Sequence, residues 1–170
     1  SCFIVGYRWK IIIETMGENL PILFASKNVF IGMFFNQFLP STFGGDFYRI
    51  FLTKKYGISL TVASFSIISD RIFGFLGLLI LCLIGTPFIL YYSNNYSLIL
   101  SILFILFSFT FVLLIIYLLQ FIPYKIKITY YLNELSKKIL ELLNLKKYKL
   151  KIISISFVLH ILNILFFYLI

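Results

Sequence analysis

The segment Phe34-Phe35-Asn36-Gln37-Phe38-Leu39-Pro40-Ser41-Thr42-Phe43-Gly44-Gly45-Asp46-Phe47-Tyr48-Arg49 places a proline, paired glycines and charges inside an apolar part of the chain, and Asp70-Arg71 follows downstream. In hydrocarbon, irregular backbone is tolerated only where protein or a wet cavity covers it. Ionisable side chains at membrane depth are costly, so each one is a candidate for function. We therefore predict that these charges of alternating sign form the centre of a polar cavity.

The composition is that of a membrane protein. The 170 residues are 61% hydrophobic and 12% charged, and the mean hydropathy is +1.03. Soluble domains average about 45–50% apolar and about 25% charged residues. The predicted fold class is an all-α integral membrane protein, a multi-pass helix bundle in the cell (inner or plasma) membrane. The net charge of +9 does not indicate nucleic-acid binding, because the basic residues gather in short segments, as membrane topology requires.

Motifs for metal, nucleotide or disulfide chemistry do not occur in the sequence. It contains no HExxH, CxxC or Walker pattern, so no metal site, cofactor or catalytic residue is predicted. Cys2 and Cys82 both lie in apolar runs, and we interpret them as small packing residues.

Residues 28–55 are expected to form a re-entrant hairpin. The apolar pieces before Pro40 and after Gly45 are each shorter than the roughly 20 residues that a helix needs to cross the bilayer. Lys27 and the pair Lys54-Lys55 bracket the segment, and positive residues favour the cytoplasmic side. Both ends would then lie on that side. One spanning helix followed by a loop is the alternative.

The charges suggest their own partners. Asp46 would lie in the first turn of the second half-helix, where a carboxylate is favoured, and Arg49 follows on the same face. An N-cap with this internal ion pair is one interpretation. Asp70 and Arg71 are adjacent and point in different directions, so each needs a partner of its own. We expect the cross-pairs Asp46–Arg71 and Asp70–Arg49.

The other segments complete a single membrane domain over residues 1–170. Tyr7 to Lys10 carry residues typical of the headgroup level, and Ile11 to Lys27 look like an interfacial segment. Because the chain begins within an apolar run, we expect it to be a fragment of a longer protein. The expected elements are the end of a spanning helix over 1–6, spanning helices over 60–92, 98–122 and 152–170, and a cytoplasmic amphipathic helix over 124–150.

Two of these segments leave alternatives open. Pro123 to Lys151 carries eight lysines, with apolar residues at helical spacing. This helix could lie on an anionic inner surface or pack against the protein itself. In the last segment, His160 and Asn163 share a face. They could bond a neighbouring helix or line the cavity.

The combined pattern resembles a known family. It consists of Asn36, Leu39-Pro40, Gly44-Gly45-Asp46, Arg49 and Asp70-Arg71-Gly74. This is similar to the flippase-like membrane region of lysylphosphatidylglycerol synthases, including the multiple peptide resistance factor. Arg8-Trp9 matches an earlier Arg-Trp pair of the family, and His160 matches a late polar position. The resemblance is clear over residues 7–85 and elsewhere rests on hydropathy. The soluble aminoacyl-transferase domain of true synthases is not in this chain.

The resemblance implies the handling of lipid head groups, either by moving them between leaflets or by presenting them to a transferase. The expected function is a lipid flippase-like transporter module, and enzymatic activity is not expected. The alternative is a membrane subunit or partner of a lipid-modifying transferase, either an aminoacyl-phosphatidylglycerol synthase or a glycosyltransferase. Expected partners are anionic membrane lipids, such a transferase and a second copy of the chain. The candidate substrate-binding residues are Asn36, Pro40, Gly44, Gly45, Asp46, Arg49, Asp70, Arg71 and His160.

The arginines and aspartates of that set suit different groups. Arg49 and Arg71 suit a phosphate, which a guanidinium binds with two parallel hydrogen bonds. Asp46 and Asp70 would either orient those arginines or bind a cationic head group.

Overall fold

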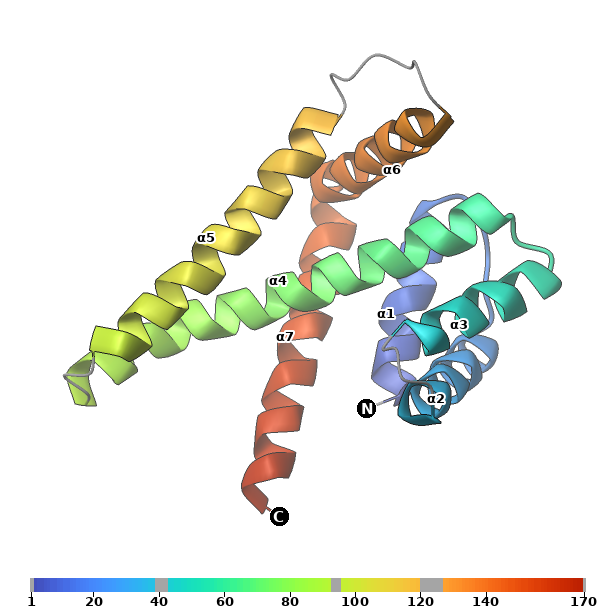
Figure 1. Cartoon of the computed structure of the whole chain (residues 1–170). Coiled ribbons are helices and arrows are strands. Elements are labelled where there is room, and N and C mark those ends of the chain that lie inside the picture. The colour runs from blue at the N-terminus through green and yellow to red at the C-terminus, as the bar shows by residue number, and fades with distance from the viewer. Residues whose placement is uncertain (1, 39–42, 93–95, 120–126, 170) are drawn as a thin grey trace.

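The structure is a computed structural model that describes residues 2–38, 43–92, 96–119 and 127–169, and these form α-helices and their connections (Figure 1). The helices are α1 (Cys2–Thr15), α2 (Ile22–Phe38), α3 (Gly44–Lys55), α4 (Leu60–Tyr92), α5 (Tyr96–Leu119), α6 (Lys127–Asn144) and α7 (Lys146–Leu169). In this part of the chain, Leu60–Phe88 and Tyr148–Leu169 are long and apolar enough to cross a membrane. The all-helical architecture agrees with the predicted membrane helix bundle.

The long helix α4 organises the arrangement. Helices α1, α2 and α3 gather at its N-terminal end, α7 crosses near its middle, and α5 runs back from its C-terminal end (Figure 1). The crossing with α7 is close because Gly77 faces Ser156, where an added Cβ would lie 2.6 Å from the serine Cβ. A glycine lets two helix backbones approach in this way.

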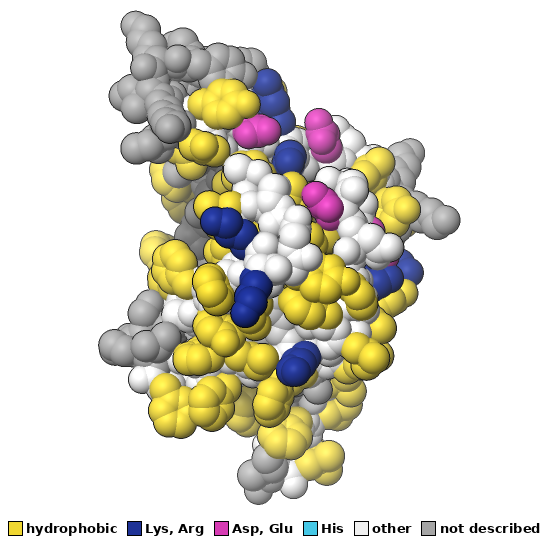
Figure 2. All heavy atoms as spheres, turned by 90° about the vertical axis from the view of Figure 1, so that its right-hand side faces the viewer, with side chains coloured by type: hydrophobic (Ala, Val, Ile, Leu, Met, Phe, Trp, Pro, Cys, Tyr) yellow, Lys and Arg dark blue, Asp and Glu magenta, His cyan; other side chains and the backbone are white. Residues whose placement is uncertain are grey.

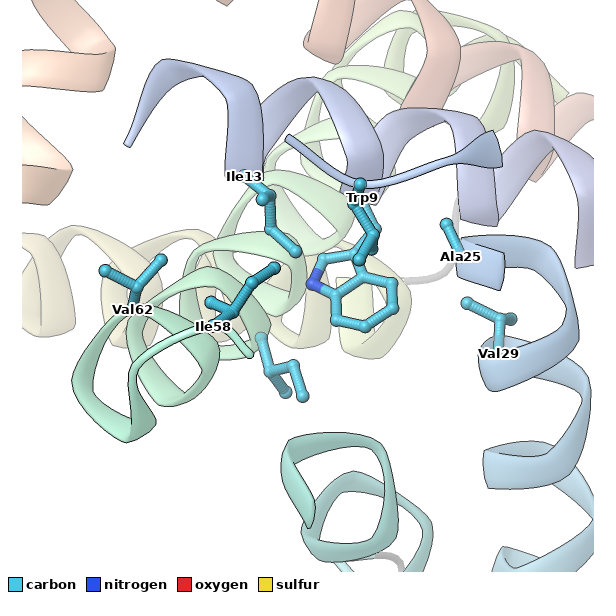
Figure 3. Close-up of a cluster of buried hydrophobic side chains, with 8 residues drawn as sticks. Trp9, Ile13, Ala25, Val29, Ile58 and Val62 are labelled. Atoms are coloured by element: carbon cyan, nitrogen blue, oxygen red, sulfur yellow. The ribbon is translucent and has the colours of Figure 1, made fainter. Parts of the chain in front are cut away.

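Helix α1 continues past residue 6 to Thr15, and one face of its second half is buried. Trp9 is 0% exposed and lies between Ile13 and Ile58 on one side and Ala25 and Val29 on the other (Figure 3). Trp9 is therefore covered by protein side chains, and the headgroup depth of Tyr7–Lys10 stays a prediction. An indole that is buried needs a hydrogen-bond acceptor, and Trp9 Nε1 donates to Ser66 Oγ at 3.0 Å.

Residues 11–27 are helical at both ends, as predicted, and their interfacial position stays a prediction. Ile11, Ile12 and Ile13 are buried residues of α1, and α2 begins at Ile22, directly after Pro21. Gly17 separates the two helices with φ of +86°, a left-handed conformation that glycine adopts without steric cost. Ile11 and Ile12 pack with residues of α4, α6 and α7, whereas Ile13 packs in the cluster around Trp9.

Helices α2 and α3 pack against each other, and the break that the sequence predicted at Pro40 falls in residues 39–42, outside the described residues. The rings of Phe24 and Tyr56 lie 4.5 Å apart, so the start of α2 is next to the end of α3. The two helices therefore run as an antiparallel pair. The pair begins at Ile22, earlier than the expected residue 28.

Helix α6 turns apolar side chains toward the protein. Leu142 packs in a buried cluster with Ile12 of α1, Phe73 of α4 and Ile152 of α7. Packing against the protein, one of the two alternatives, therefore describes this side of α6. The lysine-rich segment is shared between two helices, α6 and α7. Helix α7 begins at Lys146, six residues before the predicted start at residue 152.

Candidate functional site

The four charged residues that the sequence singled out come together with Arg8 beside a cavity that is lined by five helices, α1, α2, α3, α4 and α7. Asp46 and Arg49 come from α3, Asp70 and Arg71 from α4, and Arg8 from α1. All except Arg71 are buried, with residue exposures of 3–8%. Arg71 keeps about half of its side chain exposed, at 49%. The cluster is thus sealed on one side and open on the other.

Among the arginines near Asp70, Arg8 makes the shorter contact, although the charge pattern of the sequence did not single it out. Arg8 Nε donates to Asp70 Oδ1 at 2.7 Å, and Arg8 Nη1 donates to Ser156 Oγ at 2.9 Å. The matched Arg-Trp pair of the family was the signal that could have identified Arg8. The interfacial interpretation missed it, because a cation next to a tryptophan is also typical of a membrane boundary.

Both expected cross-pairs are present. Arg71 hydrogen-bonds Asp46 through its Nε and lies against the same carboxylate oxygen with Nη2. Arg49 Nη2 lies 3.7 Å from Asp70 Oδ2. The internal α3 pair is present as well, with Arg49 Nη1 at 3.5 Å from Asp46 Oδ1. The two interpretations of Asp46 therefore do not exclude each other.

Glycines bring α3 close enough to α2 to hold this cluster. A Cβ added at Gly45 would lie 2.0 Å from the carbonyl oxygen of Gly32, and one added at Gly32 would lie 2.8 Å from Arg49 Cδ. Gly45 N–H donates to Asn36 Oδ1 at 2.8 Å. The first amides of a helix have no partner within it. Asn36 thus caps α3 from the neighbouring helix, one residue before Asp46.

Arg49 is held in place by an aromatic ring against its guanidinium and by hydrogen bonds to its carbonyl oxygen. Its guanidinium carbon lies 4.4 Å from the centre of the Trp9 ring, a distance that suits a cation–π interaction. Its carbonyl oxygen accepts hydrogen bonds from Asn28 Nδ2 at 3.3 Å and Thr53 Oγ1 at 2.7 Å. The Nε and Nη2 atoms of Arg49 are buried and have no hydrogen-bond partner among the described residues.

The cavity has a volume of about 670 Å³ and a mixed lining, whose polar and apolar members are called here its polar (or charged) wall and its apolar wall. Its polar wall contains the five charges with Asn36 and His160, and its apolar wall contains Val5, Val29, Met33, Ile72, Phe75 and Leu78. Small-molecule sites commonly combine an apolar lining with a few placed polar groups.

The other candidate residues take different places. His160 Nε2 lies 2.9 Å from the carbonyl oxygen of Gly74 and His160 also lines the cavity, so both alternatives for this residue apply. Asn163 is exposed. Gly44 and Gly45 form the first turn of α3, and Pro40 lies outside the described residues. Within the described ranges, His, Cys, Asp and Glu side chains do not gather in groups of three that could hold a metal ion.

These features define an all-helical membrane protein with a buried charge cluster beside an amphipathic cavity. The chain belongs to the lysylphosphatidylglycerol synthase TM region family, whose model matches residues 1–170. That family is the membrane region of a lipid-modifying system. No curated protein and no solved structure matches the chain.

Proposed function

We propose that this protein is a lipid flippase-like module of the cell membrane that binds the head group of a phospholipid or lipid-linked substrate and moves it between leaflets. The observation that carries the proposal is the cavity, which is lined by both charged and apolar side chains. A polar head group could contact the charged wall while acyl chains follow Val29, Phe75 and Leu78.

A re-entrant arrangement of α2 and α3 would put this cavity within the membrane. From Lys27 to Phe38 the helix rises about 17 Å, roughly half of the ~30 Å hydrocarbon core. Lys27 and Lys54 lie at the same end of the pair, because the rings of Phe24 and Tyr56 are in contact there. Asp46 and Arg49 would then lie near the middle of the bilayer.

The outer side of the pair supports this placement. Phe30, Phe34 and Phe38 repeat at helical spacing along α2 and are 52–70% exposed. Phe47 and Phe51 of α3 are also exposed. Figure 2 shows the face of the molecule at the right of Figure 1, where hydrophobic side chains dominate the lower half and Asp and Glu side chains lie in the upper half. Such an apolar surface suits lipid chains better than water.

The second candidate is a membrane subunit that presents a lipid to a transferase. The family name supports it, because a synthase must bring its lipid substrate to a catalytic domain. In this function the same cavity would bind the lipid head group, but the lipid would not need to reach the other leaflet.

Reconstitution separates the two candidates. The purified chain is placed in vesicles with a fluorescently labelled phosphatidylglycerol, and a membrane-impermeant reductant reports how much label reaches the outer leaflet. We expect label to move faster than in protein-free vesicles, and more slowly again with Asp46→Asn. Movement no faster than in protein-free vesicles would overturn the transport proposal and leave lipid presentation as the function to test.

A further inference from the structure

The charged wall of the cavity contains one more positive than negative charge. Its ionised residues, among those that the structure describes, are the aspartates Asp46 and Asp70 and the arginines Arg8, Arg49 and Arg71. Buried charges are stable when they are paired and hydrogen-bonded. One guanidinium in this wall therefore has no carboxylate of its own.

The geometry identifies Arg49 as the arginine without its own carboxylate. Arg8 and Arg71 each donate a hydrogen bond directly to one aspartate. Arg49 lies between the two aspartates at 3.5 and 3.7 Å, distances beyond a hydrogen bond. Its side chain is 9% exposed, and two of its nitrogens have no hydrogen-bond partner among the described residues. Leaving such donors unsatisfied is costly, so a ligand that satisfies them would bind favourably.

Arg49 is also held in position before any ligand arrives. The Trp9 ring lies under the guanidinium at 4.4 Å, and Asn28 and Thr53 hydrogen-bond the Arg49 carbonyl oxygen. A guanidinium that is already ordered loses less conformational entropy on binding than a free side chain does. This group therefore has the properties of a receptor for an oxoanion.

We propose that Arg49 is the anion-binding residue of the cavity and that its ligand is a singly charged phosphate group, such as the phosphodiester of a membrane phospholipid. The inference rests on the proposed lipid-binding function and specifies which part of the lipid enters the charged wall. Arginine binds phosphate oxygens with two parallel, charge-assisted hydrogen bonds. One negative charge on the ligand would balance the single surplus positive charge of the charged wall. A cationic head group would instead add to that positive charge.

The same geometry gives the aspartates a different role from head-group binding. An Asp70 oxygen accepts from Arg8, and an Asp46 oxygen accepts from Arg71. Both carboxylates also flank Arg49 and hold its charge in place. Removing Arg49 would leave two directly bonded and balanced pairs, Arg8–Asp70 and Arg71–Asp46. An Arg49→Gln protein should therefore fold, in contrast to proteins that lose a directly bonded arginine.

The test measures binding to the full chain in an uncharged detergent. Trp9 is the only tryptophan of the chain and lies against Arg49, so its fluorescence reports directly on this site. The probes are dioctanoylphosphatidylglycerol, dioctanoylglycerol with the same chains and no phosphate, and inorganic phosphate. Arg49→Gln and Arg49→Lys are compared with Lys54→Gln, a matched loss of one charge at an exposed position of the same helix.

We expect dioctanoylphosphatidylglycerol to bind the wild-type chain roughly tenfold or more tightly than dioctanoylglycerol, as loss of a charge-assisted hydrogen bond implies. Arg49→Gln should abolish this preference, Arg49→Lys should retain part of it, and Lys54→Gln should retain it fully. Inorganic phosphate that binds as tightly, with the same dependence on Arg49, would identify a free oxoanion as the ligand. Binding by the phospholipid alone would identify the lipid.

Two results would overturn the inference. One is equal affinity of the wild-type chain for the two lipid probes, which requires no variant to fold. The other is an undiminished preference in Arg49→Gln. Because binding is measured without vesicles, a chain that prefers the phosphate-bearing lipid but moves no label would refute transport and leave this inference standing.

Discussion

Arg8 and Asp70 are 62 positions apart in the sequence, and Arg8 Nε donates to Asp70 Oδ1 at 2.7 Å in the interior of the protein. The same guanidinium also reaches Ser156, so one side chain connects α1, α4 and α7. Its burial makes the pair important for stability, because removal of Arg8 would leave the buried Asp70 without its hydrogen-bonded partner, and Arg49 at 3.7 Å is too distant to replace that hydrogen bond.

Arg8→Gln should therefore lower the free energy of unfolding by about 3–5 kcal/mol, the usual cost of breaking a buried ion pair. Lys10→Gln is the matched control, because it removes a cation from a partly exposed pair with Glu14 in the same helix. Exposed pairs contribute only about 0–1 kcal/mol. Denaturant titration in detergent measures both proteins, and equal losses would contradict a structural role for Arg8.

The pair Asp46–Arg71 should behave differently, because Arg71 is half exposed to the cavity. We expect Asp46→Asn and Arg71→Gln to insert and fold, since water in an open cavity can hydrate the remaining charge. Lipid movement in vesicles should nevertheless fall sharply in both. The measurement is transport set beside the thermal unfolding temperature for each single variant and for the double variant.

The double variant discriminates between a structural and a functional pair. It removes one charge of each sign and so leaves the balance of the cavity unchanged. If the pair only holds the fold, the double variant should recover both stability and transport. We expect transport to remain low.

Gly45→Ala should separate α3 from α2. The added methyl group would lie 2.0 Å from the carbonyl oxygen of Gly32 in α2. Because this oxygen belongs to the backbone, the clash can be relieved only if α2 and α3 move apart. We expect a loss of about 1–3 kcal/mol, typical of overpacking, together with weaker lipid binding. Gly85→Ala is the control, because a Cβ there meets nothing within 4 Å. A Gly45→Ala protein as stable as Gly85→Ala would show that the close approach is not required.

The packing of α6 can be tested with two leucines of the same helix. Leu142 is 2% exposed and lies among Phe73 and Ile152, whereas Leu132 is 37% exposed. Leu142→Ala should cost about 2–5 kcal/mol through the cavity that it leaves. Leu132→Ala should cost much less. If the two variants lose stability equally in detergent, α6 does not depend on its contact with α4 and α7.

The expected topology is open to labelling in cells. In a Cys2→Ser, Cys82→Ser background, single cysteines replace Lys54 at the end of α3 and Tyr91 at the end of α4, both of which are exposed. An impermeant maleimide should modify position 91 from outside and should reach position 54 only after the cells are broken. Modification of position 54 in intact cells would exclude a cytoplasmic end for the α2–α3 pair.

Local rules were enough to predict the membrane class and much of the charged site. Hydropathy of long apolar runs indicates helices in lipid, because a helix satisfies its own backbone polar groups. Asp70 and Arg71 had to find separate partners, since adjacent residues of a helix point in different directions. That argument predicted Asp46–Arg71 and Asp70–Arg49, both present in the structure. The bounds of α4 match the predicted helix over 60–92, which Ser59 precedes as a cap.

The partners of Arg8, Trp9 and α6 depended on how the helices pack. A cation next to an indole suits a membrane interface and a protein interior equally well, and only the contacts with Asp70 and Ser66 distinguish them. The amphipathic pattern of α6 is the same whether lipid or protein covers its apolar side. The buried Arg49 donors that have no hydrogen-bond partner among the described residues are likewise not predictable from the sequence, because they depend on which of three arginines reaches each of two carboxylates. Apolar periodicity and charge can be read from the sequence. Which of several chemically equivalent groups a side chain contacts depends on the distances that the packed helices set in three dimensions.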